Sequence, residues 1–407
     1  MAKEEKKAPK LRFNGYTNDW ERKKLGDVVE FYSGLTYKPE NIAQSGTLVI
    51  RSSNIHNSQY VNADNVYVKN NIVNSEYVKK QDIVVVVRNG SRNLIGKHAL
   101  LTSIPHNPSV IGAFMTGIRS SDNQFIETLL NTEQFKREIN KNLGATINQI
   151  TTSQFKKMRF HFSKQKENKQ IGVLFTYLDN SINLHENYLQ LLYNFRSFLL
   201  QKMFSINDTF PNLRFKQFND KWKYKKLGEV ADIVSGGTPD TTKHNYWNGS
   251  INWYTPAEVG NKIFVSDSQR KITNIGLENS SAKILPVGTI LFTSRAGIGK
   301  TAILKEKGST NQGFQSIVPK KKSLDSYFIF SMSNILKKYG ESHGAGSTFL
   351  EISGKELAKA KISLPSITEQ KNISKVLFKL DTIITLQKQE IDNLKKLKQF
   401  LLQNMFI

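Results

Sequence analysis

Apolar side chains recur at heptad spacing in two long segments, one near the middle of the chain and one at its end. The first segment runs from Glu167 to Met203 and the second from Glu369 to Met405. Such a stripe is typical of a helix that pairs with another helix, and neither stripe is stable when exposed to water. We therefore predict that two long helices pair with each other through Phe175, Leu178, Ile182, Leu189, Leu192, Leu199 and Met203 in the first, and Leu377, Leu380, Ile384, Ile391, Leu394, Leu401 and Met405 in the second.

The segments that precede these two helices have a different pattern, with short apolar runs broken by Gly, Pro, Asn and Ser. This pattern favours α+β domains with several strands and protruding loops. The longest aliphatic run, Ile83 to Val87, predicts one buried strand. It leads into a basic loop that ends at Lys97, and a similar segment runs from Gly288 to Lys300.

An internal repeat organises the whole chain. The segment Leu11-Arg-Phe returns as Leu213-Arg-Phe, 202 positions later, and the same offset relates Phe198-Leu-Leu-Gln to Phe400-Leu-Leu-Gln. One offset at both ends indicates two copies of one unit, each a globular region followed by a helical region. We predict target domains at 1–154 and 211–355, helical regions at 155–210 and 356–407, and a pseudo-two-fold arrangement in which antiparallel helices separate the two globular regions.

Charge narrows the choice of partner. The 407 residues carry a formal net charge of +24, which favours a polyanion such as nucleic acid. Because no run approaches the ~20 apolar residues of a membrane span and the charged start does not resemble a secretory signal, we expect a cytoplasmic protein without a membrane partner. With no cysteine and seven scattered histidines, neither a disulfide nor a metal site is expected.

Three sets of enzyme motifs are incomplete in this sequence. The segment Ser294 to Thr301 resembles a phosphate-binding loop, but serine replaces its first glycine. A nuclease needs Pro-Asp followed closely by an acidic-x-Lys triplet. Pro239-Asp240 stands alone, and we interpret Glu369-Gln-Lys371 and its counterpart at Glu167 as helix surface. A methyltransferase needs a Pro-Pro loop and a glycine-rich cofactor turn. The chain contains no Pro-Pro pair, and Gly344-Ala-Gly346 is a lone glycine pair without the rest of such a turn. No catalytic residue is predicted.

Two details of the helices bear on their ends and their register. The second helix begins with a capping-box pattern, Ser366-Ile-Thr-Glu369, which the first copy lacks. The apolar stripes contain polar residues at matching places, among them Arg196 and Lys398, and His185 and Gln387. These polar positions indicate either a partly exposed seam or a device that fixes the register of the pair.

Several segments together resemble the specificity subunit of bacterial type I restriction-modification enzymes. They are Leu227-Gly-Glu-Val-Ala-Asp-Ile-Val-Ser-Gly-Gly-Thr-Pro239, Tyr246-Trp-x-Gly-x-Ile-x-Trp253, Asn311-Gln-Gly-Phe-Gln315 and Leu364-Pro-Ser-Ile-Thr-Glu-Gln-Lys-Asn-Ile373. The resemblance implies that each globular region reads one half of a bipartite duplex DNA target. It also implies that two modification (methyltransferase) subunits dock on the helices, that restriction subunits join the complex, and that S-adenosylmethionine, ATP and Mg²⁺ belong to those partners, with no cofactor on this chain.

Candidate DNA contacts are the polar and basic residues of the loops, because Arg suits guanine edges, Asn and Gln suit adenine, and Lys mostly binds phosphate. Each of them has an alternative as plain surface or as a structural turn. The candidates are Arg51, Ser52, Asn54, Arg88, Asn89, Ser91, Arg92, Lys97, Thr146, Asn148 and Gln149 in the first copy, and Thr255, Arg295, Lys300, Gln312, Gln315, Ser347 and Thr348 in the second.

Two other classes of function stay open on sequence alone. One is a self-contained restriction or modifying enzyme whose motifs have drifted, and the other is a coiled-coil scaffold that binds nucleic acid or membrane through its charge. Incubating the chain alone with duplex DNA, Mg²⁺, ATP and S-adenosylmethionine distinguishes a self-contained enzyme from a DNA-recognition subunit. Comparing the binding of DNA, RNA and lipid distinguishes a scaffold from a DNA-recognition subunit.

Overall fold

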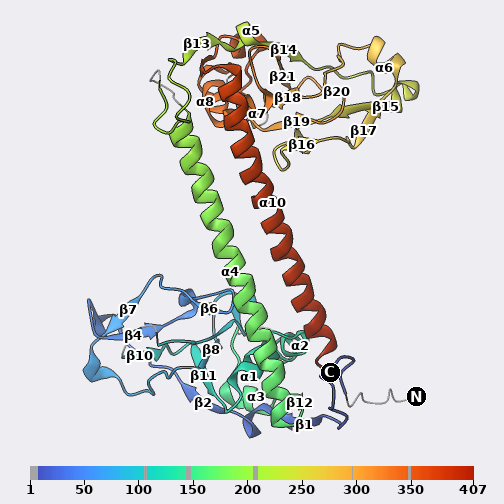
Figure 1. Cartoon of the computed structure of the whole chain (residues 1–407). Coiled ribbons are helices and arrows are strands. Elements are labelled where there is room, and N and C mark those ends of the chain that lie inside the picture. Colours follow the sequence, from blue (N-terminus) through green and yellow to red (C-terminus); the bar gives the residue numbers. More distant parts are fainter. Residues whose placement is uncertain are drawn as a thin grey trace. The chain divides into compact units, whose positions relative to one another are not determined.

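The computed structural model divides the chain into two compact units. It describes residues 8–407 except 105, 107, 144–147, 205–209, 296 and 347–349. Unit 1 comprises Met1–Asn187 with Gln389–Ile407, and unit 2 comprises Tyr188–Lys388. Each unit therefore contains one globular region and one part of each long helix, α4 (Gln165–Met203) and α10 (Ile367–Asn404), which Figure 1 draws as continuous helices.

Unit 1 contains two four-stranded sheets, ordered β10-β4-β7-β3 and β2-β11-β8-β9, and two small pairs, β1-β12 and β5-β6. Its strands are β1 (Glu21–Lys24), β2 (Glu30–Ser33), β3 (Ile42–Ala43), β4 (Thr47–Ile50), β5 (Ile55–His56), β6 (Gln59–Tyr60), β7 (Val66–Val68), β8 (Ile83–Val86), β9 (His98–Leu100), β10 (Ser109–Ile111), β11 (Met115–Arg119) and β12 (Arg159–Phe162). Its short helices are α1 (Asn123–Leu130), α2 (Glu133–Asn142) and α3 (Thr152–Lys157).

Strand β8 explains the aliphatic run in the first copy. All four of its residues are fully buried, as the sequence predicted for this segment. Ile83 and Val85 pack into a cluster with Phe125 and Phe155, whereas Val84 and Val86 pack into a second cluster on the other face of the sheet. A strand covered on both faces needs apolar side chains at every position, not at every second one.

Unit 2 contains a five-stranded sheet, β14-β21-β18-β19-β16, a three-stranded sheet, β17-β15-β20, and the pair β13-β22. Its strands are β13 (Lys223–Lys226), β14 (Ala231–Ser235), β15 (Trp247–Tyr254), β16 (Phe264–Val265), β17 (Arg270–Ile272), β18 (Ile290–Phe292), β19 (Thr301–Leu304), β20 (Gly308–Thr310), β21 (Gln315–Pro319) and β22 (Lys361–Leu364). Its short helices are α5 (Leu227–Val230), α6 (Asn274–Glu278), α7 (Ser326–Ser331), α8 (Ser333–His343) and α9 (Gly354–Leu357).

The strand pairings confirm that the two units are copies of one fold. Antiparallel pairing of β1 with β12 is repeated by β13 with β22, and β2-β11-β8-β9 is repeated by β14-β21-β18-β19. Ser33 lies opposite Thr116 in unit 1, and its repeat, Ser235, lies opposite Gln315 in unit 2. The strand register therefore shows which residues of the two copies correspond, even where their sequences have diverged.

The long helices run antiparallel within each unit. In unit 1, Lys398 donates to Asp179, and the Nζ of Lys395 lies 2.6 Å from a carboxylate oxygen of Glu186, so residue numbers fall along α10 as they rise along α4. In unit 2, Arg196 donates to Asp381 through two guanidinium nitrogens. Tyr193 lies beside Lys388, whose Nζ is 5.3 Å from the centre of the ring.

Arg196 and Lys398, two of the polar residues of the apolar stripes, thus each have a charged partner on the other helix. Arg196 is the repeat of Lys398, and Asp179 is the repeat of Asp381, so one interhelical ion pair occurs once in each unit. A shift of the helices by one turn would separate both pairs, and charged contacts of this kind discriminate between registers in helix pairs. This favours the register interpretation of Arg196 and Lys398 over that of a partly exposed seam.

A second repeated ion pair joins the start of each globular region to the start of its long helix. Arg12 donates to both carboxylate oxygens of Glu167, at 2.9 and 2.8 Å, and Arg214 donates to Glu369 at 2.7 and 2.8 Å. Both glutamates are buried, so the prediction that they lie on the helix surface was wrong. The predicted capping box forms only in part, because Ser366 accepts from the N–H of Glu369 while the carboxylate of Glu369 binds Arg214.

The environment of Glu167 predicts an acid sensitivity of unit 1. Burial opposes its ionised form, but hydrogen bonds from Arg12 and Ser163 outweigh burial and hold the pKa of Glu167 below that of an ordinary glutamate. A lowered pKa in the folded state stabilises the fold at neutral pH, and this contribution is lost as the pH falls below the unfolded value of about 4.3. We expect the free energy of unfolding of unit 1, measured in urea, to fall more steeply between about pH 5 and pH 3 than it does in Glu167→Gln.

Candidate nucleic-acid interface

In unit 1 the loop between β8 and β9 carries most of the basic candidates. Arg88 is exposed and lies two residues after the end of β8, and its guanidinium is 5.1 Å from the centre of the Phe114 ring. The backbone N–H of Arg88 donates to the carbonyl of Phe114, at 3.2 Å. The backbone of Asn89 bonds to Asn148 and a bridge joins Arg88 to Gln149, so the structure brings these four candidates together.

The loop after β4 lies against the same region. Asn89 donates to the hydroxyl of Ser52 at 3.3 Å, and the Nζ of Lys97 donates to the Ser52 carbonyl at 3.1 Å. Arg51 donates to the carbonyl of Asp64, which holds its side chain beside this loop. Ser91 and Arg92 are exposed on the β8–β9 loop, with Arg92 in the short turn η5 (Arg92–Leu94).

One candidate of this group has a structural role. Asn54 is fully buried in the turn η3 (Ser52–Asn54), where its side chain accepts from the N–H of Arg51 and donates to Ala63 and Asn65. It shapes the loop and does not reach a surface that DNA could contact, which corrects the prediction for this residue. Thr146 lies outside the described residues.

In unit 2 the corresponding loop joins β18 to β19. Arg295 is partly exposed, and its Nη1 lies 3.8 Å from a carboxylate oxygen of Glu351, where Arg88 instead has an aromatic ring. Lys300 is exposed, and its backbone N–H donates to Thr293 at 2.9 Å. Gln312, which lies outside this loop between β20 and β21, is exposed and accepts from Thr238. The β18–β19 loop therefore presents an arginine and a lysine, as its counterpart in unit 1 does. Its arginine, however, lies near a carboxylate, whereas that of unit 1 lies over an aromatic ring.

Two further candidates of unit 2 make hydrogen bonds within their own domain, and only one of them is buried. Gln315 is buried and accepts from Ser235 at 2.8 Å, so its prediction as a DNA contact is corrected. Thr255 begins the turn η7 (Pro256–Glu258), and its hydroxyl and N–H donate to Glu258 at 2.8 and 2.7 Å. Ser347 and Thr348 lie outside the described residues.

The segment that resembles a phosphate-binding loop has the wrong continuation. A phosphate-binding loop ends at the N-terminus of a helix, whose free N–H groups hold the phosphates. Here Thr301 begins strand β19, and its side chain is buried against Ser333 at 2.9 Å. Gly297 and Gly299 have positive φ and form the turn between β18 and β19.

The residues predicted to pair the helices lie on the inner faces of α4 and α10. In unit 1, Phe175 and Leu178 share a cluster with Leu401 and Met405. In unit 2 the clustered residues are Leu189, Leu192, Leu199, Met203, Leu377, Leu380 and Ile384. Ile182 and Ile391 are buried, and Leu394 is partly buried.

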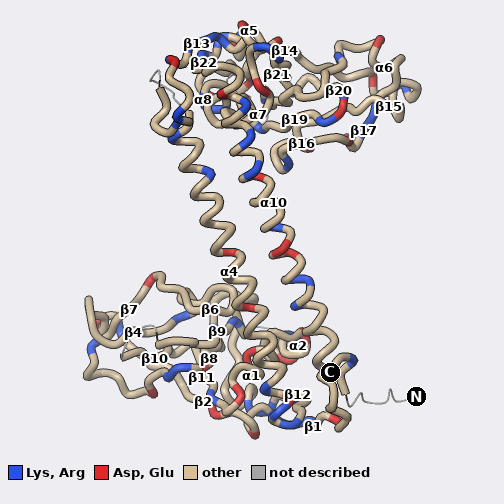
Figure 2. The backbone as a smooth tube through the Cα atoms, viewed as in Figure 1, with Lys and Arg blue, Asp and Glu red and all other residues tan. Residues whose placement is uncertain are grey.

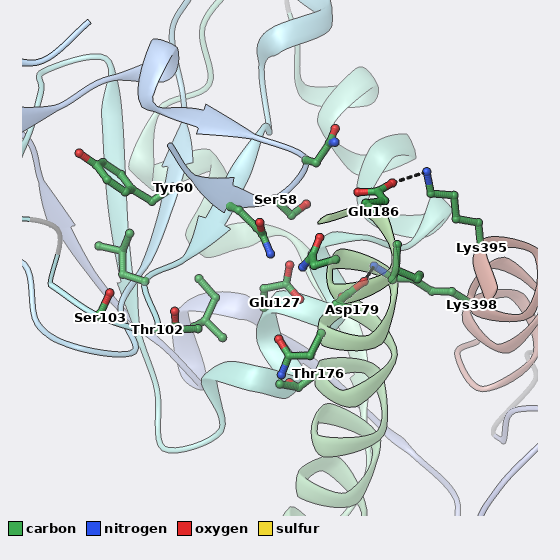
Figure 3. Close-up of a pocket in the computed structure, with 17 residues that line it drawn as sticks. Ser58, Tyr60, Thr102, Ser103, Glu127, Thr176, Asp179, Glu186, Lys395 and Lys398 are labelled. Atoms are coloured by element: carbon green, nitrogen blue, oxygen red, sulfur yellow. Dashed lines mark hydrogen bonds and ion pairs between the residues drawn. The ribbon is translucent and has the colours of Figure 1, made fainter. Parts of the chain in front are cut away.

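A polar cavity of about 510 Å³ lies in unit 1 where the globular region meets the helices. Figure 3 shows that its carboxylates face lysines: Asp179 meets Lys398 and Glu186 meets Lys395. Glu127 also lines the cavity, and an oxygen of its carboxylate lies 3.6 Å from the Nε2 of His98. Among the described residues no group of three or more acidic, histidine or cysteine side chains is arranged to hold a metal ion.

Lysine and arginine positions are spread along the backbone of both units, as the blue segments of Figure 2 show. All four residues of β13 are exposed, and three of them are lysines. Two of these, Lys225 and Lys226, repeat Lys23 and Lys24 of β1. No helix within the described part of the chain combines the length and apolar character of a membrane span.

Phe114 and Glu351 were not among the candidates. Each touches the arginine at the matching position of its unit, yet lies 26 or 56 positions from it in sequence. A single phenylalanine or glutamate in a loop carries no signal of such a contact, so only the fold identifies them.

The family model described as type I restriction modification DNA specificity domain matches the chain twice, at residues 17–194 and 219–396. The MjaIX specificity subunit of Methanocaldococcus jannaschii is 37% identical over 189 residues, covering 46% of this chain and 44% of that protein. The EcoR124I/EcoR124II specificity subunit of Escherichia coli is 32% identical over 180 residues, 42% of this chain and 43% of that protein. The match thus spans less than half the length of each of these relatives.

Longer matches cover the whole repeat. The putative MjaX specificity subunit of M. jannaschii is 25% identical over 400 residues, covering 94% of this chain and 91% of that protein. The crystal structure of a type I restriction-modification S subunit from M. genitalium has the same fold, with a TM-score of 0.65 at 17% identity over 98% of this chain and 99% of that one. With a family domain in each half, this chain belongs to the type I restriction-modification DNA specificity family.

Proposed function

We propose that this chain is the DNA-recognition subunit of a type I restriction-modification complex, in which each unit reads one half of a bipartite duplex target. The observation that carries the proposal is the repeated β8–β9 and β18–β19 loop, which presents an arginine, Arg88 or Arg295, at the surface of each unit. Two copies of one fold with different loops suit a target made of two different half-sites. The net charge of +24 favours the DNA backbone as a partner for both.

The exposed apolar residues on the outer faces of the helices support the proposal that modification subunits dock there. In unit 2, α4 exposes Tyr188, Leu191, Phe195 and Phe198, which are spaced three and four residues apart and so share one face. The rings of Phe195 and Phe198 stack at 6.5 Å. Exposed apolar faces of this kind mark protein interfaces. The other exposed apolar residues of the two helices are Tyr177, Leu184, Leu397 and Phe400 in unit 1, and Tyr193, Phe378, Ile383 and Leu386 in unit 2.

In this proposal, methyl transfer and cleavage take place on the partner subunits. S-adenosylmethionine, ATP and Mg²⁺ belong to two modification subunits and to the restriction subunits that join them, and the complex acts in the cytoplasm. The relatives support this division of labour because they are named as specificity subunits. A solved structure with the same fold, at a TM-score of 0.53, is described as addressing complex assembly of the type I system.

Methylome sequencing of a strain with and without this gene tests the proposal. We expect a split methylated motif that disappears with the gene. Incubating the purified chain alone with duplex DNA, Mg²⁺, ATP and S-adenosylmethionine should give neither methylation nor cleavage. Activity of the chain alone would instead favour a self-contained enzyme, and equal binding to RNA or lipid would favour a scaffold.

Arg88→Ala and Arg295→Ala distinguish base reading from phosphate binding. We expect each variant to weaken the preference for cognate over random duplex by about 1–3 kcal/mol if the arginine contacts a base edge. Each loss should be confined to substitutions in one half-site, and to a different half-site for each variant, so the variants are controls for one another. Filter binding at fixed salt measures both affinities. Equal loss for cognate and random duplex would show that the arginine holds phosphate.

A further inference from the structure

A hollow of about 560 Å³ opens in unit 1 beside the loops that carry the basic candidates. Its walls come from three segments that are distant in sequence: the chain after β2, the loop after β4, and the turn between β10 and β11. They are mostly apolar, with one cation, and include Leu35, Tyr37, Ile42, Arg51, Ala113 and Phe114. A volume of this size lies within the range of sites that hold small organic groups.

Two large apolar side chains stand at this hollow without being buried. Phe114 is 54% exposed and Ile42 is 48% exposed. Single exposed apolar residues are common and need no explanation. Here, however, the ring of Phe114 also carries the guanidinium of Arg88 at 5.1 Å, and Arg51 lines the same hollow. An apolar surface framed by cations suits a ligand that is anionic overall and apolar at one point.

We propose that Phe114 and this hollow read a thymine of the first half-site through its 5-methyl group. The proposal rests on the proposed function, because it assumes that the loops of unit 1 meet DNA. In the major groove the 5-methyl of thymine is the distinctive apolar group of a base edge, and phenylalanine is one of the side chains that contact it. Other base edges would place hydrogen-bonding groups against the exposed side chains of Phe114 and Ile42, which offer them no partner, and this is costly.

Unit 2 lacks this device, which makes the proposal specific to one half-site. Since Thr116 and Gln315 occupy matching positions of the sheets, Phe114 corresponds to Gly313. A Cβ on Gly313 would lie only 2.9 Å from the Cγ of Pro256, so the matching place is closed by the loop of unit 2. The two units therefore differ at a position next to their matching arginines.

Deoxyuridine substitution tests the contact, because it removes only the methyl group. The full-length chain is assembled with its methyltransferase subunits and bound to duplexes in which each thymine of the target is replaced in turn. We expect one thymine of the first half-site to show about a four-fold loss of affinity, as burial of one methyl group predicts. In Phe114→Ala that loss should vanish, and in Phe114→Leu, which keeps an apolar side chain, part of it should remain.

Thymines of the second half-site provide the internal control, since their response to deoxyuridine should be the same in all three proteins. Binding of the second half-site also reports whether each variant is folded. An unchanged response to deoxyuridine in Phe114→Ala, or a first half-site without a thymine that responds, overturns the inference. If the assembled complex methylates no bipartite motif at all, the proposed function fails instead, so the two failures are distinguishable.

Discussion

Replacing Arg214 with methionine is expected to lower the free energy of unfolding of unit 2 by about 3–5 kcal/mol. The side chain of Glu369 is 1% exposed and that of Arg214 is 12% exposed, so removing the arginine leaves a carboxylate buried without its counter-charge. The indole N–H of Trp222, 3.4 Å from Glu369, is too weak a partner to replace two guanidinium bonds. Denaturant unfolding gives the free energy, and hydrogen exchange shows which unit loses protection.

Three further variants make this expectation sharp. Arg12→Met removes the same contact from unit 1, so its loss of protection should fall there and not in unit 2. Lys359→Met breaks an exposed pair with Glu356 and should cost less than about 1 kcal/mol. The double variant Arg214→Met, Glu369→Met should recover most of the loss, because a buried pair is often replaceable by apolar side chains. Arg214 also donates to the backbone carbonyl of Asp220, at 2.6 Å. A double variant as unstable as Arg214→Met alone would therefore contradict the role given to the pair with Glu369.

The sequence predicted the parts of the fold that depend on periodicity. Phe175 and Leu377 are fully buried, as the heptad stripe predicted. The stripe is a pattern of residues close in sequence, so this prediction required no knowledge of distant residues. The same holds for β8, whose four aliphatic residues needed cover on both faces. Duplication was also readable, since a constant offset at both ends of a chain has no local explanation.

Contacts between distant residues were not predictable in the same way. Arg12 and Glu167 are 155 positions apart, and both belong to phrases that the repeat preserves, yet a repeat does not say which preserved residues touch. The interface shows a related limit. Asn54 and Gln315 have side chains suited to DNA, but residue type does not tell whether a side chain points to solvent or into a turn.

Residues 1–210 alone are expected to form a homodimer that, with the modification subunit, recognises an inverted repeat of the first half-site. In the full chain, unit 1 is completed by residues 389–407, whose Met405 and Phe406 pack against Phe125 and Phe175. The fragment lacks that segment and exposes the apolar face that it covered. Met203 and Phe204 are the repeats of Met405 and Phe406, so only a second copy offers a matching replacement.

The charged residues of the seam support this exchange. If two fragments pair as the full chain does within a unit, Arg196 of one copy takes the place of Lys398 and meets Asp179 of the other, because Arg196 and Lys398 are repeats. In this pairing the two Arg196 side chains therefore do not meet each other. The repeat of Lys395 is Tyr193, so each Glu186 exchanges its lysine partner for a tyrosine, which makes the homodimer weaker than the native pairing.

Sedimentation of the fragment at micromolar concentration measures the association, and methylation mapping with the partner subunit reads the target. Asp179→Lys should abolish the dimer, since it places two cations face to face in a partly buried seam. Adding Arg196→Glu should restore it by reversing both charges. Neither substitution changes an apolar residue of the stripe. Rescue by the charge-reversed pair would therefore show that Asp179→Lys disrupts association and not folding. A fragment that stays monomeric with its partner present, or a methylated site without inverted symmetry, would contradict the equivalence of the two units.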